Sequence, residues 1–227
     1  MDRCLTCRSC ETTCPSGVEY GQLLEIGREM MESKRGRLQS LYRYIVRKTL
    51  STPLLFRPAG YFLRHSKINS KAIKPKIINS SVLLMGGCVQ PSLAPNINHS
   101  IKNILAKLNI EVLESSQGEC CGALDQHLAA SSDALKKVKR NIDHWISKLD
   151  SGVEAIISSA SGCGVMIKDY PNLFEESDPY YEKSLLISSK TKDIAEFLVN
   201  QDLSSLKLKE LNIAYHEPCT MQHGQKL

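Results

Sequence analysis

The chain has 227 residues, of which 42% are hydrophobic, so it can bury the core of one large domain or of two small ones. It contains no run of about 18 apolar residues, so the sequence predicts no membrane-spanning helix. Its nine cysteines, odd in number and clustered, indicate a reducing compartment rather than a disulfide framework. We expect a cytoplasmic location, and peripheral attachment to the inner face of the cell membrane as a further expectation.

The net charge of +5 is distributed unevenly along the chain. Residues 33–110 include 14 Lys and Arg but no Asp or Glu, whereas the rest of the chain carries 24 acidic and 15 basic residues. Such a basic segment suits an anionic membrane surface or an acidic partner. Nucleic acid is not expected as a partner, because the sequence has no recognition motif and no aromatic stacking platform.

Four cysteines lie close together near the start of the chain: Cys4, Cys7, Cys10 and Cys14, with Pro15 directly after the last. The spacing C-x-x-C-x-x-C-x-x-x-C-P is typical of chains that ligate a 4Fe–4S cluster through thiolates. Structural zinc sites are the alternative, but they usually divide their cysteines between two separated C-x-x-C pairs, and the other five cysteines form none. The motif therefore predicts an iron–sulfur site and electron transfer.

The last cysteine of this motif raises a second question. In two-cluster ferredoxins the cysteine before proline ligates the other cluster, which requires a second C-x-x-C-x-x-C run that this sequence lacks. Either Cys14 closes a single cluster, or the partner motif lies upstream and the sequence is a fragment. We expect the fragment.

Residues 18–48 are predicted to be mostly helical. In 38–50, apolar residues recur at helical spacing with Arg43, Arg47 and Lys48 between them. Two interpretations stay open for this amphipathic stretch. Either its apolar face packs on the core of its own chain and its basic face is solvated, or the basic segment 33–76 contacts a membrane surface or a partner.

The end of this helical region is marked by Pro53, Pro58 and Gly60. We therefore expect a helical domain of the ferredoxin type over residues 1–60. A basic linker follows over 61–80.

A different pattern begins at residue 81, where short apolar strands alternate with helices. Strands are predicted over 81–87, 110–113, 154–158 and 213–215, and helices over 97–108, 124–149 and 193–199. This alternation predicts an α/β fold with a parallel sheet, formed over residues 81–210.

The sequences VLLMGGCVQP and IAYHEPCTMQ form an internal repeat, 131 positions apart. Residues 211–227 would then begin a second repeat that the sequence does not complete, so we expect truncation at both ends.

The remaining cysteines each follow a predicted strand or lie in the loop after it: Cys88, Cys120, Cys121, Cys163 and Cys219. In open α/β sheets that edge is where ligands bind, so these cysteines form a candidate second site. The alternative for Cys88 or Cys163 alone is a small buried hydrophobic residue. His216 and His223 flank Cys219, and they are either part of a mixed Cys/His site or ordinary surface or core histidines.

The order of Cys88, Cys120-Cys121-Gly122 and Ser161-Gly162-Cys163-Gly164 resembles the CCG cysteine-rich domain. That domain occurs in heterodisulfide reductase subunits, anaerobic glycerol-3-phosphate dehydrogenase, lactate-utilisation proteins and glycolate oxidase. With RCLTCRSCETTCPSGVEY, CCGALDQHL and HEPCTMQHGQKL also considered, the chain most closely resembles the iron–sulfur subunits of glycolate oxidase.

The resemblance implies two ferredoxin-type motifs followed by two CCG repeats, of which this sequence lacks the first motif and most of the second repeat. By this resemblance Cys4, Cys7 and Cys10 match three ligands of one 4Fe–4S cluster, and Cys14 matches a ligand of another, so one or two clusters are expected. The five later cysteines match CCG-domain cysteines, which hold a further cluster in some relatives. The pattern here lacks the C-terminal C-x-x-C of those relatives.

The implied function is an electron-transfer subunit without catalytic residues of its own. FAD-containing partner subunits would oxidise glycolate to glyoxylate and pass electrons through the clusters, one at a time, to an acceptor. FAD is expected only in a partner, because this chain has no G-x-G-x-x-G motif. The alternatives are the same role in a lactate or glycerol-3-phosphate dehydrogenase, and a zinc-stabilised interaction module.

Overall fold

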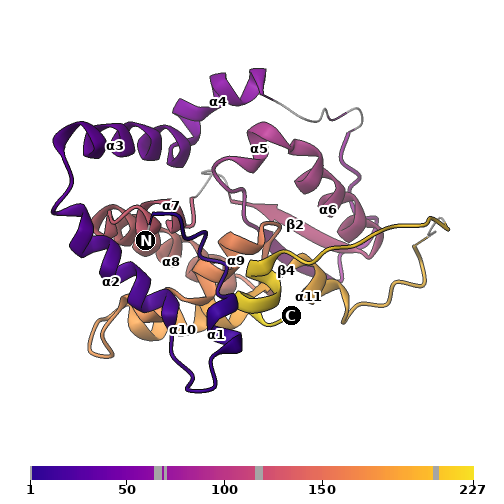
Figure 1. The fold of residues 1–227 in the computed structure, drawn as a ribbon. Helices are drawn as coiled ribbons and strands as arrows, with labels where there is room; N and C mark the ends of the chain where they lie inside the picture. Colours follow the sequence, from indigo (N-terminus) through magenta and orange to yellow (C-terminus); the bar gives the residue numbers. More distant parts are fainter. Residues whose placement is uncertain (1, 64–67, 69–70, 116–119, 207–209) are drawn as a thin grey trace.

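A four-stranded sheet forms the centre of the second part of the molecule (Figure 1). The computed structural model describes residues 2–63, 68, 71–115, 120–206 and 210–227. The strands are β1 (Ser80–Leu84), β2 (Ile110–Glu114), β3 (Ala155–Ser158) and β4 (Thr191–Asp193). They are all parallel, in the order β2-β1-β3-β4. The α/β fold with a parallel sheet is confirmed.

Helices cover both faces of this sheet, because successive strand residues point to opposite sides. Val82 and Leu84 of β1 pack with α6 (Pro95–Lys107) and α11 (Ile194–Leu198) in one apolar cluster. Leu83 packs in the other cluster with α8 (Ser131–Asp150), α9 (Ser161–Lys168) and α10 (Tyr181–Lys190). In that second layer Trp145 is fully buried and stacks on Tyr170, with ring centroids 6.2 Å apart.

The first part of the chain is helical, as predicted. It consists of α1 (Ser9–Thr13), α2 (Tyr20–Glu32), α3 (Arg37–Ser51) and α4 (Pro53–Phe62). Pro53, Pro58 and Gly60 do not themselves end the helical region, because all three lie inside α4, which ends at Phe62. Proline is well tolerated in the first helical turn, where its missing N–H has no partner to lose, so Pro53 begins this helix rather than ending one. Part of the predicted linker, residues 64–67 and 69–70, lies outside the described residues.

Four further short helices complete the fold: α5 (Gln90–Leu93), α7 (Ala123–His127), η1 (Tyr170–Leu173) and η2 (Thr220–Gln225). The last of these, η2, packs on α9 and α1, so the C-terminal helix lies beside the first helix of the chain (Figure 1). The approach is close, since a Cβ atom added to Gly224 would lie 2.6 Å from Val165.

Two predicted elements differ from the structure. The helix expected over 124–149 is divided into α7 and α8, because Ala129 between them adopts a left-handed backbone conformation with φ 57°. The strand expected over 213–215 is not formed. Leu211, Ile213 and Tyr215 are exposed there, and a strand needs a neighbouring strand to satisfy its backbone groups. No helix in the described part of the chain has the length and apolar character to cross a membrane.

Candidate functional site

The first cysteine run forms an open loop that leads into α1. Cys4 and Cys10 are exposed, whereas Cys7 and Cys14 are partly buried. Two residues between the cysteines, Thr6 and Arg8, have left-handed backbones with φ 57° and 61°. Non-glycine residues seldom adopt this conformation, and each such residue stores strain that its surroundings must balance.

Arg28 of α2 makes contacts that compensate for this strain. Its guanidinium group donates hydrogen bonds to the Cys4 carbonyl oxygen at 2.8 Å and to Thr6 Oγ1 at 3.2 Å, and it also pairs with Glu25 at 3.1 Å. The Arg28 side chain is only 6% exposed, so these contacts are largely shielded from water. A buried cation on α2 thus fixes the shape of the loop that carries the thiols.

Cys14 lies in an environment that favours its thiolate form. Hydrogen bonds from backbone N–H groups, first from Val18 and then from Ser16, lower the pKa of the Cys14 thiol below its ordinary value. The Tyr20 hydroxyl lies 3.9 Å from Cys14 Sγ and acts in the same direction. Because the thiolate is the form that binds metals, this loop geometry suits Cys14 to a ligand role.

A hollow of about 290 Å³ adjoins the loop. Cys4, Cys10 and Tyr20 line it, together with the apolar side chains Leu23 and Leu24. Thiols, a hydroxyl group and apolar carbon are the surroundings that iron–sulfur clusters have in proteins, so the donor set fits such a group.

The second set of cysteines lies at the carboxyl end of the sheet. Cys88 follows β1 through Met85, Gly86 and Gly87, and the pair Cys120-Cys121 precedes Gly122 at the start of α7. Gly87 and Gly122 have φ values of 77° and 91°, which only glycine adopts without strain, so each turns the backbone beside a cysteine.

Cys163 belongs to the same edge but lies within a helix. The prediction of a loop at this residue is wrong, because Ser161 begins α9 directly after the turn that follows β3. The two strands that lead to Cys88 and Cys163, β1 and β3, are neighbours, whereas the chain from β1 runs to β2 on the other side. The sheet therefore reverses its strand order between them, which is the position at which ligands bind in open α/β sheets.

Four of the five later cysteines contact one another. The Cys120 thiol forms hydrogen bonds with the thiols of Cys121 and Cys88, and the Cys121 thiol forms another with that of Cys163. These hydrogen bonds, the one from Cys121 foremost, lower the pKa of Cys120 well below its ordinary value, while those of Cys88 and Cys121 are raised. The set therefore favours one thiolate, Cys120, stabilised by its neutral neighbours.

Cys219 is separate from this set. It is exposed and directly precedes η2, next to Thr220, whose hydroxyl lies 2.7 Å from the Ser161 hydroxyl. His223 Nδ1 lies 2.8 Å from the Thr12 hydroxyl.

Within the described residues, no three or more His, Cys, Asp or Glu side chains are arranged to hold one metal ion.

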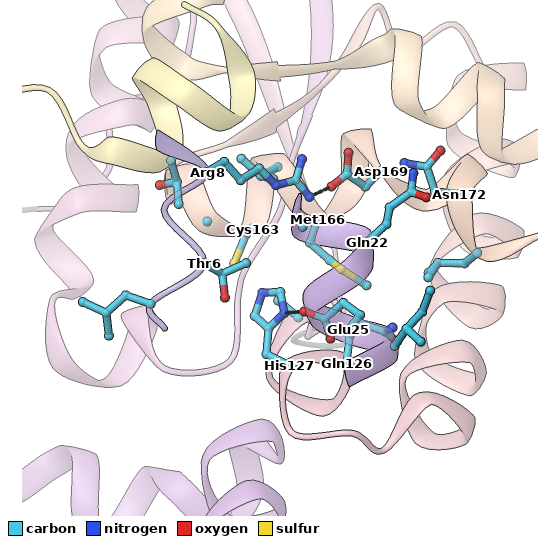
Figure 2. A pocket seen from close by; sticks show the side chains of 18 of the residues that line it. Thr6, Arg8, Gln22, Glu25, Gln126, His127, Cys163, Met166, Asp169 and Asn172 are labelled. Carbon is cyan, nitrogen blue, oxygen red and sulfur yellow. Dashed lines mark hydrogen bonds and ion pairs between the residues drawn. The ribbon is translucent and has the colours of Figure 1, made fainter. Parts of the chain in front are cut away.

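A cavity of about 550 Å³ lies between the two cysteine sites (Figure 2). Thr6 and Arg8 of the first loop line one side, and Cys163 and Met166 of α9 line another. Arg8 forms an ion pair with Asp169 at the end of α9. The cavity is therefore bounded by both candidate sites.

A second polar pair crosses the same cavity. His127 Nδ1 of α7 lies 2.8 Å from Glu25 Oε1 of α2, and Gln126 lies beside them (Figure 2). The sequence offered no signal for these residues, because His127 and Glu25 are 102 positions apart. Arg8 alone could have been noticed, since it lies inside the first cysteine motif.

The comparisons with known proteins agree with both cysteine patterns. A family model described as the CCG cysteine-rich domain matches residues 82–168. The glycolate oxidase iron-sulfur subunit of Escherichia coli K12 is 38% identical over 100% of this chain and 60% of its own length. The probable glycolate oxidase iron-sulfur subunit of Bacillus subtilis is 25% identical over 98% of this chain, again with 60% of its length covered.

A lactate utilization protein A, from Bacillus licheniformis, is 27% identical over 59% of this chain and 55% of its own length. No solved structure matches the chain. The chain spans about 60% of the length of the glycolate oxidase relatives that it matches. Residues 82–168 therefore form a CCG cysteine-rich domain, and the chain as a whole is similar to the iron–sulfur subunits of glycolate oxidases.

Proposed function

We propose that this chain is the electron-transfer subunit of a complex that oxidises glycolate to glyoxylate. The observation that carries the proposal is the Cys4–Cys14 run, which stands in a chain similar over its whole length to a glycolate oxidase iron–sulfur subunit. Partner subunits containing FAD would take the two electrons of glycolate, and this chain would relay them singly to an acceptor.

Cys4, Cys7 and Cys10 would hold one 4Fe–4S cluster, and Cys14 is the ligand for the same cluster or for a second one. The cluster supplies one-electron redox chemistry when bound. The chain's own residues prepare the site: Arg28 holds the Cys4 carbonyl, and the backbone N–H groups of Val18 and Ser16 stabilise the Cys14 thiolate.

Cys88, Cys120, Cys121 and Cys163 would provide the candidate second metal site, and their thiols would have to turn toward one ion to bind it, because they are not arranged around a common point in the described structure. A thiolate at Cys120 is a suitable first ligand for a metal, because cysteine binds metals in its deprotonated form, and the neutral thiols beside it would lose their protons on binding. Cys219 remains a candidate fifth member, held near α9 through Thr220.

The first experiment is anaerobic reconstitution with iron and sulfide, followed by metal and sulfide analysis. Cys7→Ser should lose the iron of the first site, whereas Ser9→Ala in the same loop should keep it. Visible absorbance that dithionite bleaches identifies a cluster. Stoichiometric zinc without such absorbance would favour a zinc-stabilised interaction module instead, and unchanged iron in Cys7→Ser would contradict the first site.

The second experiment identifies the electron donor. The reconstituted chain, mixed with its flavoprotein subunits, should be reduced when glycolate is added. Reduction by lactate or glycerol 3-phosphate, with glycolate inactive, would assign the same electron-transfer role to a different dehydrogenase. The similarity to a lactate utilization protein makes lactate the more informative of these two comparisons.

A further inference from the structure

The helix α3 packs its polar side, not its apolar side, against the rest of the protein. Arg47 donates hydrogen bonds at 2.6 Å to Asp125 and to Asp133, and Lys48 lies 2.9 Å from Asp133. Asp125 is fully buried, and Arg47 and Ser51 are buried with it. The interpretation of α3 as a helix with a core-facing apolar side and a solvated basic side is therefore wrong.

The apolar stripe of α3 faces outward. Leu38, Leu41, Tyr42 and Ile45 follow the i, i+3, i+4, i+7 spacing of one helix face, and all are exposed, Leu38 by 84% and Tyr42 by 70%. A surface helix usually turns such a stripe toward the core. An apolar stripe left in water is the mark of a surface that contacts something else.

The next helix extends this exposed apolar area. α4 contacts α3, and its Leu54, Leu55 and Phe62 are exposed, Phe62 by 87%. Both helices lie at the outer edge of the molecule, where α3 contacts α7 and α4 contacts α5 (Figure 1). We call these residues the α3–α4 surface: Leu38, Leu41, Tyr42, Ile45, Leu54, Leu55 and Phe62.

Cations outnumber anions around this surface, where Asp2 and Glu32 pair with Arg35 and Arg43. Lys34 and Arg37 are exposed at the start of α3, and Arg57 is exposed on α4. No Asp or Glu occurs from residue 33 to residue 110. An apolar stripe bordered mainly by cations complements a layer that is anionic on its outside and apolar beneath, which describes a bilayer containing acidic lipids.

We propose that the α3–α4 surface binds peripherally to a membrane that contains anionic lipids. Leu38, Leu54 and Phe62 enter the boundary between head groups and acyl chains, and Lys34, Arg37 and Arg57 contact the lipid phosphates. Tyr42 suits the boundary between head groups and acyl chains, because its ring is apolar and its hydroxyl is polar. This inference stands independently of the proposed redox function.

The test is sedimentation of the whole chain with vesicles of phosphatidylcholine, with and without phosphatidylglycerol. Binding should require phosphatidylglycerol and weaken as salt is added. The variant Leu38→Ser/Phe62→Ser should bind at least tenfold more weakly, and Lys34→Gln and Arg37→Gln about fivefold each. Leu185→Ser/Leu186→Ser, on the exposed side of α10, is the matched control and should bind normally.

A second measurement reports on contact directly. Tyr42→Trp should shift its fluorescence to shorter wavelength when anionic vesicles are added, against a constant signal from the buried Trp145. Absence of vesicle binding, or equal binding by Leu38→Ser/Phe62→Ser, would overturn the proposal. So would loss of flavoprotein binding in that variant with vesicle binding intact, because the surface would then be a protein interface.

Discussion

Among single residues, the strained positions of the first cysteine loop depend on one arginine. Thr6 and Arg8 hold left-handed backbones, and each such residue costs about 1–3 kcal/mol unless neighbouring contacts compensate. Arg28 makes the hydrogen bonds that hold the Cys4 carbonyl and the Thr6 hydroxyl. The loop geometry, and with it the spacing of the thiols, follows from a residue outside the motif.

Arg28→Gln should therefore weaken the site without removing a ligand. We expect a loss of about 2 kcal/mol in the free energy of unfolding, the usual value for charged hydrogen bonds, and faster release of iron to a chelator. Urea unfolding and the chelation rate measure the two effects. Arg37→Gln, on the exposed start of α3, should change neither, and equal iron release in both variants would contradict the role of Arg28.

A second prediction for a single residue concerns Gly122, which directly follows the pair Cys120-Cys121 and has a φ of 91°. Gly122→Ala should destabilise the protein by about 1–2 kcal/mol, because an L-residue is strained in this region. A Cβ atom there would also lie 3.4 Å from the Ala134 carbonyl oxygen. Gly36→Ala is the control, as Gly36 has φ −67° and open space around it, and it should unfold at the wild-type urea concentration.

At the level of helices and strands, the ion pairs between α3 and α8 make the stability of the folded protein depend on pH. Hydrogen bonds from Arg47 and Lys48 lower the pKa of Asp133 from 3.8 to about 2. A carboxyl group with a lowered pKa in the folded state contributes its full stability above its unfolded pKa and loses it as the pH falls. The loss should therefore occur between about pH 4 and about pH 2.

Asp133→Asn should flatten that part of the pH profile. The measurement is the midpoint of thermal unfolding between about pH 5 and pH 2, compared with the wild type. Asp150→Asn, at the exposed end of the same helix, is the control and should retain the wild-type slope. A wild-type slope in Asp133→Asn would mean that these ion pairs do not contribute to stability.

The sequence could predict those elements that have strong apolar periodicity, and it missed those that do not. β1, β2 and β3 were predicted because each is an apolar run, whereas β4 reads Thr-Lys-Asp and has no such pattern. The break at Ala129 and the helix α10 were also missed. The 213–215 strand was wrong because an apolar run says nothing about whether a neighbouring strand is present to pair with it.

The candidate cysteine site and the orientation of α3 also differ in how far the sequence could predict them. The convergence of Cys88, Cys120, Cys121 and Cys163 could be predicted, since the carboxyl ends of parallel strands meet at one edge. The orientation of α3 could not, because its apolar period is equally compatible with either face inward. Its orientation depends on Asp125 and Asp133, which lie 78 and 86 positions from Arg47.

At the level of the whole molecule, several polar contacts join the helical part to the CCG domain and the residue that follows it. Arg8 pairs with Asp169, Arg47 with Asp125, and His127 with Glu25. Each pair joins one residue from the first 62 to one that lies in the CCG domain or directly follows it. Such contacts tie the first cysteine loop to α9, the helix that carries Cys163.

The ion pair of Arg8 with Asp169 connects the first cysteine loop to the end of α9, and mutation can test this connection. Burial raises the pKa of Asp169 and Arg8 opposes that effect, so removal of Arg8 leaves a poorly compensated carboxyl group. Arg8→Met should reduce the free energy of unfolding by about 2 kcal/mol, and Arg8→Met/Asp169→Asn should recover part of it. A double-mutant cycle in urea measures the coupling between the two side chains.

Hydrogen exchange then tells whether this pair joins the two parts or only stabilises one of them. In Arg8→Met the amides of α2 should exchange faster while those of β1 and β3 stay protected, because the helical part opens without the sheet. Lys168→Met, which breaks the pair with Glu196 between α9 and α11, is the matched control and should leave α2 unchanged. Uniform acceleration across α2 and β1 in Arg8→Met would show that the parts unfold as one unit.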